Sequence, residues 1–215
     1  MLIRPLALWV PGVYDDHHMS AAPTRRPASS RKEATHERIV GTAARAIRRS
    51  GYHGSGVAEI MKQAGLTHGG FYAHFESREG MLAEAADRAG AETVAVLARV
   101  AAAAPPQKAL EALLGAYLSK EHVEGVETGC PVAALGSEMP RQASKVRRAA
   151  TRRIKEMIDL VARQSPDWGK PGAHEQALVT VATALGALVL ARAVDDPKLS
   201  KAVREAALNH LTSTD

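Results

Sequence analysis

The sequence is poor in cysteine and in aromatic residues. One cysteine among 215 residues cannot form an intramolecular disulfide, so nothing points to an oxidising compartment. Phenylalanine, tryptophan and tyrosine together make up 4% of the chain. Alanine is abundant instead, and an alanine-rich chain with few aromatic and β-branched residues favours helix over sheet. Because 46% of the residues are hydrophobic, the composition predicts an all-α protein of one or two domains.

Long apolar runs are also missing. The longest run, residues 177–191, is shorter than the ~20 residues that a membrane span needs, and Thr180 and Thr183 interrupt it. The apolar patch at residues 6–10 is short for a signal peptide and is followed by no convincing cleavage site. We therefore expect a cytoplasmic protein with no membrane partner.

Signatures of catalysis are absent as well. The chain has no phosphate-binding loop, no zinc signature and no serine in a nucleophile elbow. His122 lacks a second credible metal ligand at a suitable spacing. We predict no catalytic residue, no metal site and no cofactor, and hence no enzyme. A helical enzyme or a protein-interaction module remains the alternative from another class.

The positive charge is concentrated in one part of the chain. The net charge is +5, and residues 24–79 account for it with ten lysines and arginines against five acidic residues. This segment predicts a polyanionic partner such as DNA. Residues 1–30 contain four prolines and no steady period, which predicts a disordered arm, and Met19 is the expected native start. The arm carries basic residues that either contact DNA or are merely solvated: Arg25, Arg26, Arg31 and Lys32.

Three short helices are predicted after this arm. Residues 31–50 carry apolar side chains at helical spacing, and Gly51 ends the pattern. A second helix spans residues 57–64, Gly65 stops it, and a third begins at residues 67–68. Two short helices joined by a tight glycine-containing turn are typical of a helix-turn-helix motif.

The two phenylalanines of the chain are the expected core of this small unit. Phe71 and Phe75 lie four residues apart in the third helix and therefore share a face. We expect them to pack against the first two helices at Ile39, Ala43 and Ile60. Ser77 is predicted to cap a fourth helix that ends before the two prolines at residues 105 and 106.

The rest of the chain predicts further helices and no strands. Their expected ranges are 107–124, 130–139, 141–164, 173–194 and 198–212. The basic face of the helix over 141–164 is either a solvated face or a second nucleic-acid surface. The last two helices are the dimerisation candidates, because they could form a four-helix bundle across a two-fold axis. Their predicted apolar stripe comprises Leu178, Val181, Leu185, Leu188 and Val189.

An ordered set of motifs over residues 36–82 resembles the DNA-binding domain of the TetR/AcrR family of bacterial transcriptional regulators. The set consists of Ile39 with Ala43-Ala44, Gly51-Tyr52, Val57 with Ile60, Ala64-Gly65-Leu66, Phe71-Tyr72-x-His74-Phe75, Ser77-Arg78-Glu79 and Leu82. Residues 186–200 also resemble the closing helices of one branch of the family. The sequence departs from the family at Arg78, where lysine is usual, and at Ala58, where a polar or acidic residue is frequent.

The resemblance implies a division into two functional parts. A TetR-type DNA-binding domain is expected over residues 33–93, with its helix-turn-helix at about 56–75. A helical domain for ligand binding and dimerisation is expected over residues 94–215. Both parts fit the all-α class that the composition predicts.

DNA contacts are expected around the third helix. In the family, the positions of Tyr72 and His74 touch DNA phosphates, and a phenol and an imidazole can each donate to an anionic oxygen. Arg78 keeps the family's positive charge and could reach a phosphate. Thr67 and Ser55 each lie near a helix start, where they could cap the helix, bind phosphate, or do both. Recognition helices present their N-terminal residues to base edges, here His68, Gly69 and Gly70.

The second domain offers a candidate effector pocket at Tyr117, His122 and Cys130. Cys130 begins a predicted helix and is either a thiol sensor or a small apolar core residue. Beyond residue 79 the only aromatic residues are Tyr117 and Trp168. That scarcity argues against an aromatic cage for a large cation and favours a modest apolar or weakly polar effector.

These expectations combine into one function. We predict a homodimeric repressor that binds a palindromic operator in double-stranded DNA and is released by a small-molecule effector. The two-fold symmetry predicts half-sites about 34–36 Å apart, or a multiple of this spacing. An activator or a thiol- or electrophile-sensing regulator on the same fold is the alternative.

Overall fold

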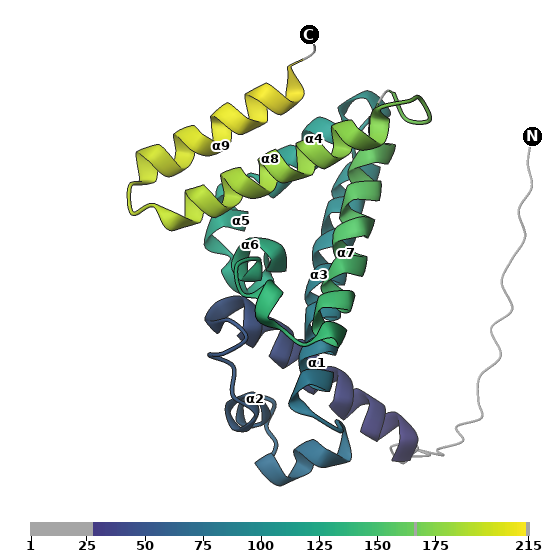
Figure 1. Ribbon diagram of the computed structural model, residues 1–215, viewed down its shortest axis with the longest axis vertical. Helices are drawn as coiled ribbons and strands as arrows, with labels where there is room; N and C mark the ends of the chain where they lie inside the picture. The colour runs from purple at the N-terminus through teal and green to yellow at the C-terminus, as the bar shows by residue number, and fades with distance from the viewer. Residues whose placement is uncertain (1–27, 166, 214–215) are drawn as a thin grey trace, which may run out of the picture.

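The computed structural model describes residues 28–165 and 167–213, and all regular structure over these residues is helical (Figure 1). This confirms the predicted all-α class. The α-helices are α1 (Ala28–Ser50), α2 (Val57–Gln63), α3 (Arg78–Ala103), α4 (Ala109–Tyr117), α5 (Lys120–Glu124), α6 (Pro131–Leu135), α7 (Ser144–Arg163), α8 (Ala173–Ala193) and α9 (Pro197–Thr212). The 3₁₀ helices are η1 (His68–Ala73), η2 (Pro106–Lys108), η3 (Val126–Thr128) and η4 (Met139–Arg141).

The first helix is longer than predicted. Residues 28–30 belong to α1, so the predicted disorder over residues 1–30 is wrong for these three positions. No proline or glycine interrupts the chain between Ala28 and Val40, which allows the helix to start this early. Arg31 and Lys32 therefore lie on a helix rather than on an arm. Residues 1–27, with the expected start at Met19, lie outside the described part of the chain.

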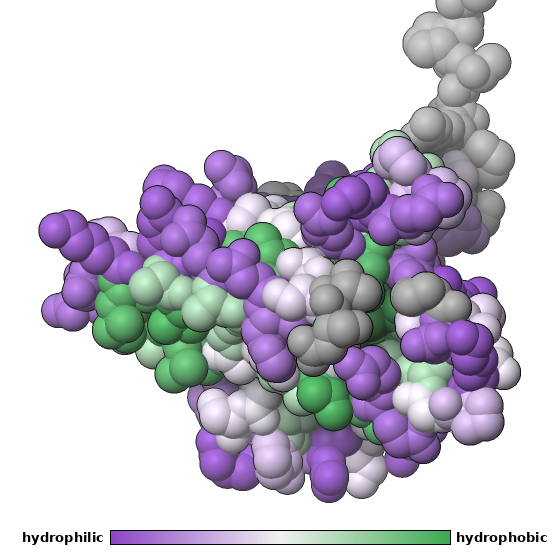
Figure 2. All heavy atoms as spheres, turned by 90° about the horizontal axis from the view of Figure 1, so that it is seen from above, coloured by the Kyte–Doolittle hydropathy of each residue, from purple (hydrophilic) through white to green (hydrophobic). Residues whose placement is uncertain are grey.

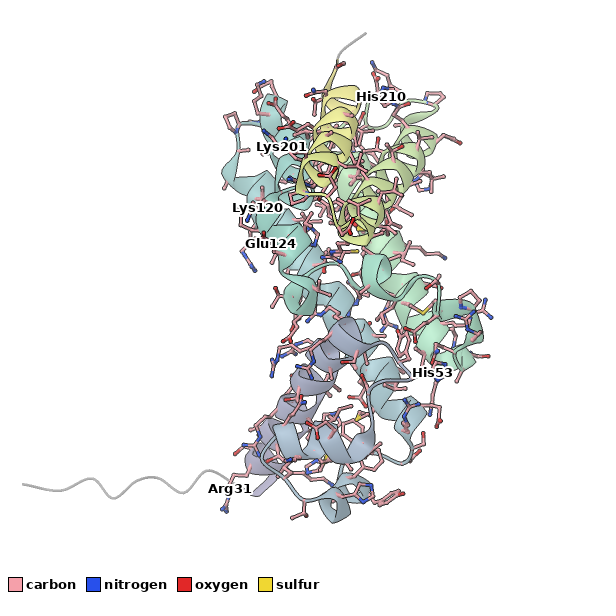
Figure 3. The ribbon with its side chains drawn as sticks, turned by 90° about the vertical axis from the view of Figure 1, so that its left-hand side faces the viewer. Arg31, His53, Lys120, Glu124, Lys201 and His210 are labelled. Atoms are coloured by element: carbon pink, nitrogen blue, oxygen red, sulfur yellow. The ribbon has the colours of Figure 1, made fainter. Side chains whose placement is uncertain are left out.

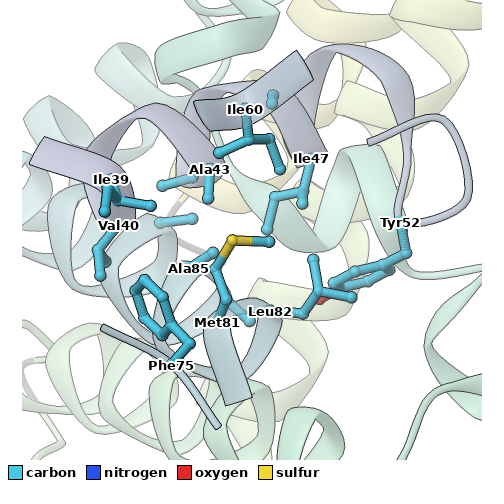
Figure 4. Packing of buried hydrophobic residues seen from close by; sticks show 14 of the residues in the cluster. Ile39, Val40, Ala43, Ile47, Tyr52, Ile60, Phe75, Met81, Leu82 and Ala85 are labelled. Carbon is cyan, nitrogen blue, oxygen red and sulfur yellow. The ribbon is translucent and has the colours of Figure 1, made fainter. Parts of the chain in front are cut away.

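The N-terminal elements form a head that consists of α1, α2, η1 and the first half of α3. Its core holds Phe71 and Phe75, stacked with 5.5 Å between ring centroids. As predicted, they belong to one buried cluster with Ile39, Ala43 and Ile60, part of which Figure 4 shows. The cluster also takes in Leu135 from α6 and Val146 from α7. The head therefore packs directly on the remaining helices, which we call the body.

Helix α3 belongs to both parts. Ser77 caps its start as predicted, since the Ser77 hydroxyl oxygen accepts a hydrogen bond of 3.1 Å from the Gly80 amide. The first half of α3 contributes Met81 and Leu82 to the head core, and its second half contributes Leu97 to the body core. Helix α7 lies alongside α3 over much of its length (Figure 1). Helix α3 is therefore one continuous element that joins the head core to the body core.

The remaining body helices close one end of the molecule. Helices α8 and α9 lie side by side across the end opposite α2 (Figure 1). The predicted helix over 107–124 is divided into η2, α4 and α5, because Ser119 leaves the helix and caps α5 through the His122 amide. Helix α8 has 21 residues, and an 18-residue window within it has a mean hydropathy of 1.6, so it is long and apolar enough to cross a membrane by length and composition alone. A single helix of this kind is weak evidence for a membrane span, because core helices of soluble proteins pass the same test.

Candidate functional site

The predicted recognition helix is a 3₁₀ helix. In η1 the Gly70 amide donates to the Thr67 carbonyl, an i to i+3 bond of 3.1 Å. Gly69 and Gly70 have low helix propensity, which accounts for the tighter, shorter geometry. Thr67 occupies the N-cap position with extended backbone, but its side chain makes no capping hydrogen bond. The capping role predicted for Thr67 is therefore not seen, and its exposed hydroxyl is available to another partner.

Several predicted contact residues are exposed along η1. The Tyr72 side chain is 72% exposed, although the neighbouring Phe71 ring is buried. Thr67, His68 and Gly69 are exposed as well. A Cβ atom added at Gly69 would meet no other atom within 4 Å, so the backbone there is open to a close approach. Arg31 lies at this same end of the molecule (Figure 3).

His74 is partly buried beside the head core. Its ring centroid lies 6.1 Å from that of His36, which stacks on Phe75. Burial lowers the pKa of His74, and the nearby His36 and Lys32 lower it further. Its Nδ1 atom is buried without a hydrogen-bond partner among the described residues. A neutral His74 can therefore carry its proton on Nε2 and donate from there to a phosphate oxygen.

Two predicted contact residues have internal roles instead. Ser55 is 3% exposed, and its hydroxyl donates a 2.8 Å hydrogen bond to the Gly51 carbonyl. The Arg78 guanidinium donates to the carbonyl oxygens of Tyr52 and Ser55. Both side chains help to hold the turn between α1 and α2. Ser55 is too buried for the predicted DNA contact without a rearrangement, whereas Arg78 is half-buried and uses only its Nη2 atom in these bonds, so its phosphate contact stays a prediction.

The sequence reasoning missed a connection between head and body at Arg48. This side chain is 2% exposed, and its guanidinium forms an ion pair of 2.7 Å with Glu92 on α3. It also donates to the Gly129 carbonyl at 3.4 Å, one residue before Cys130. The signal was present in the spacing, since Arg48 follows Ala44 by four residues and so shares its buried face. Arg48 thus joins α1 to the loop that leads into the candidate pocket.

The three candidate pocket residues lie together in the body. The His122 Nδ1 atom lies 2.6 Å from the Tyr117 carbonyl oxygen, and the Cys130 amide donates a 2.9 Å hydrogen bond to His122 Nε2. These bonds fit a neutral imidazole with its proton on Nδ1. Burial lowers the pKa of His122, which is consistent with the neutral form. Cys130 is buried at the start of α6, as predicted for its place in the sequence.

Two small cavities flank this cluster. One has a volume of about 10 Å³ and is lined by Leu97, Leu113, Leu114, Tyr117, Met157, Val161, Val181 and Ala184. The other, of about 20 Å³, lies between α3, α6 and α7 and is lined in part by Cys130 and Met157. Each volume is close to that of a single water molecule. A larger effector would therefore have to displace side chains. The described residues contain no group of three or more potential metal ligands among His, Cys, Asp and Glu.

Comparisons with known proteins agree with this arrangement of head and body. Residues 39–85 match the sequence model of bacterial regulatory proteins of the tetR family, and residues 106–206 match that of the C-terminal domain of LmrA/YxaF-like transcriptional regulators. Two curated proteins from strains of Mycobacterium tuberculosis, both described as uncharacterised HTH-type transcriptional regulators, are 32% identical over 165 residues. The alignment covers 73% of this chain and 83% of each relative. The chain belongs to the TetR family of transcriptional regulators.

Solved TetR-family structures share the fold. The reduced form of NemR from E. coli superposes with a TM-score of 0.70 at 22% identity, covering 83% of this chain and 95% of that one. A TetR regulator from Chloroflexus aurantiacus gives a TM-score of 0.71 at 26% identity, covering 86% and 98%. Membership of the TetR family confirms the prediction of a DNA-binding transcriptional regulator that is not an enzyme.

Proposed function

We propose that this TetR-family regulator is a cytoplasmic homodimeric repressor that binds a palindromic operator and leaves it when a small molecule enters the body. The observation that carries the DNA interface is the exposed Tyr72 ring at the tip of the head, beside two buried phenylalanines. The proposed interface consists of Thr67, His68, Gly69, Gly70, Tyr72 and His74. The proposed effector pocket lies at Tyr117, His122 and Cys130, and the functional division falls between residues 93 and 94.

The outer face of α8 supports the proposed dimer. Leu178 and Val179 in the first half of this helix and Leu190 near its end are large apolar side chains that remain exposed, and exposed apolar surface of this kind marks interaction sites. Figure 2, viewed from the α8–α9 end, shows apolar surface gathered on this end of the molecule. The predicted stripe must be corrected, because Val181 and Leu188 pack into the body core instead. This exposed apolar face would be buried if it packed against the same face of a second copy of the chain, as in a two-fold symmetric dimer.

The route from effector to DNA runs through two connections. Helix α3 continues from the head core into the body core, and Arg48 donates to the Gly129 carbonyl beside the pocket. An effector that fits better when the two heads are splayed would draw the population away from the operator-competent state. Moving that balance from 99:1 to 1:99 requires about 5.5 kcal/mol of differential binding.

The DNA interface can be tested with a double variant, Tyr72→Phe with His74→Ala. We expect weaker binding to every DNA sequence and a salt dependence that is shallower by about one to two units, because phosphate contacts carry no sequence information. The measurement is fluorescence anisotropy on the DNA upstream of the protein's own gene at several salt concentrations. His53→Ala is the matched control, since His53 is also exposed but lies away from the Arg31 end of the head (Figure 3). Unchanged affinity in the double variant would remove Tyr72 and His74 from the interface.

A further inference from the structure

Arg192 of α8 is a cation without a counter-charge. Its Nη2 atom donates to the His122 carbonyl at 2.6 Å, and its Nε atom donates to the Val123 carbonyl at 3.2 Å. Its Nη1 atom is buried and has no hydrogen-bond partner among the described residues. Within the same part of the chain, no acidic side chain lies within ion-pair distance of this guanidinium, and burial lowers the pKa of Arg192.

Two other buried or half-buried arginines have an acidic partner: Arg48 has Glu92 at 2.7 Å, and Arg153 has Asp87 at 2.6 Å. Arg204, by contrast, resembles Arg192, since it forms no ion pair among the described residues and its Nε atom is buried without a partner. A guanidinium that is withdrawn from water is usually paired with an anion, because desolvation of an isolated charge is costly. Arg192 departs from this rule at a position beside the proposed effector pocket. Two carbonyl dipoles orient its side chain but do not neutralise its charge.

A second donor with little use lies in the same place. The Tyr117 side chain is 3% exposed, and no oxygen or nitrogen atom of the described residues accepts a hydrogen bond from its hydroxyl, which interacts only with the weakly accepting Cys130 thiol. Burial raises the pKa of Tyr117 well above its usual value, so the hydroxyl keeps its proton and remains a donor. Tyr117 and Arg192 both lie beside His122, whose ring centroid is 4.9 Å from that of Tyr117 and whose carbonyl accepts from Arg192. The surroundings of His122 therefore hold two donors, the Tyr117 hydroxyl and the cationic Arg192 Nη1, from which no oxygen or nitrogen atom of the described residues accepts.

We propose that the pocket binds an aliphatic monocarboxylate, whose carboxylate accepts hydrogen bonds from the Tyr117 hydroxyl and from Arg192 Nη1. This inference rests on the proposed function, because it names the chemical class of the effector. A carboxylate has two acceptor oxygens and the negative charge that Arg192 lacks. A neutral acceptor would satisfy the donors but leave the cation uncompensated.

Two water-sized cavities, neither of them lined by Arg192, lie beside Tyr117 and Cys130, and the apolar part of the ligand would have to enlarge them. Tyr117 lines the 10 Å³ cavity, whose other walls are Leu, Met, Val and Ala side chains. Cys130 lines the 20 Å³ cavity on the other side, and Met157 lines both. Methionine is unbranched and adapts its rotamer readily, so a shift of Met157 would join the two spaces. The joined space would be bounded mainly by aliphatic side chains, which suits a flexible alkyl chain.

Isothermal titration calorimetry of the full chain tests the charge preference. Octanoate, 1-octanol and octylammonium are matched probes, since they share an eight-carbon chain and differ in the head group. We expect octanoate to bind at least about tenfold more tightly than 1-octanol, as a charge-assisted hydrogen bond predicts, and octylammonium not to bind. Equal affinity for octanoate and 1-octanol, or no octanoate binding, would overturn the proposal.

Two variants separate binding from stability. Tyr117→Phe removes a hydroxyl that interacts only with the weakly accepting Cys130 thiol, so the melting temperature should change little while octanoate affinity falls about tenfold. Arg192→Gln should reduce octanoate affinity to that of 1-octanol. Arg204→Gln is the control, because Arg204 is also a body arginine that bonds a backbone carbonyl, that of Leu118. Full octanoate affinity in Tyr117→Phe would contradict the assignment of the hydroxyl.

DNA binding is measured separately, so that failure of the two proposals can be told apart. Saturation with octanoate should weaken DNA binding of the wild-type protein and leave that of Arg192→Gln unaffected. A protein that binds DNA but does not prefer octanoate would overturn the carboxylate class and leave the proposed regulator intact. A protein that prefers octanoate but binds no DNA would overturn the proposed function and leave the assigned ligand class intact.

Discussion

At the scale of single residues, His122 makes the stability of the fold depend on pH. Its two ring nitrogens bond the Tyr117 carbonyl and the Cys130 amide, and only the neutral ring satisfies both. Burial lowers the pKa of His122, whereas the unfolded chain takes up a proton near pH 6.5. The unfolded state therefore binds more protons below that pH. Stability should fall as the pH drops through about 6.5 and level off below the folded pKa.

The contribution of His122 can be isolated by substitution. We expect wild-type protein to lose more unfolding free energy between about pH 7.5 and about pH 5.5 than His122→Gln loses, because glutamine does not titrate. Urea unfolding at the two pH values gives the comparison. His53→Gln should keep the full pH dependence, since His53 is exposed in the α1–α2 turn. An equal loss in wild type and His122→Gln would show that another group carries the effect.

Residue roles were predictable where they follow from spacing. The four-residue interval between Phe71 and Phe75 correctly placed both rings in the head core. Phe75 lies beyond the end of η1 at Ala73, however, and the two rings come together because the Phe75 amide donates a 3.0 Å hydrogen bond to the Phe71 carbonyl. The internal role of Arg78 was not predictable, because its acceptors are backbone oxygens of a turn whose path no periodicity describes. The unusual environment of Arg192 could have been predicted from its position in the sequence. Arg192 is the one lysine or arginine within α8, and a charge that interrupts an apolar helix needs a partner.

At the scale of the elements, helix ends were more predictable than helix type. Gly51 and Gly65 end their helices with positive φ angles of 75° and 70°, the region that favours glycine. The type of η1 was missed, since the motif locates a recognition segment without specifying an α or a 3₁₀ geometry. The predicted helix over 107–124 is divided because the backbone of Ser119 is extended and its side chain caps a new helix, α5. The apolar periodicity of the segment does not reveal this change of backbone conformation.

The open backbone of η1 gives a prediction at this scale. Gly69→Ala should raise the unfolding free energy by about 0.4–1 kcal/mol, because the new methyl group meets no atom and the unfolded chain loses freedom. It should also weaken DNA binding if the backbone approaches the bases closely there. Gly65→Ala should instead destabilise the protein, since φ is +70° at that position. Urea unfolding and anisotropy measure the two effects, and unchanged DNA affinity in Gly69→Ala would place its backbone away from the DNA.

At the scale of the whole molecule, the proposed DNA-binding surface and the proposed dimer surface lie at opposite ends. The η1 segment is at the head end, and the exposed face of α8 crosses the other end (Figure 1). A dimer formed through α8 would carry two heads on one side of a shared two-fold axis. The separation of those heads would then depend on the angle at which α3 and α7 pack against α8. A ligand that spreads packed helices in the body could therefore change the spacing without touching the DNA-binding residues.

The assembly itself can be tested on an exposed side chain that contributes nothing to the core of one chain. Leu190 is 56% exposed on α8, so Leu190→Glu should leave the monomer folded. If this face is the interface, an unpaired carboxylate buried there would cost at least about 3 kcal/mol and raise the dimer dissociation constant at least about a hundredfold. Sedimentation velocity should then show a monomer at micromolar concentration.

Val96→Glu is the matched control for this substitution. Val96 is similarly exposed but lies on a different helix, α3, so its glutamate variant should remain dimeric. The monomeric Leu190→Glu protein should also bind the operator more weakly, because each chain can then contact only one half-site. A Leu190→Glu protein that stays dimeric would move the interface to another surface. The separation of the two heads, and with it effector release, would then depend on the helices that form that surface.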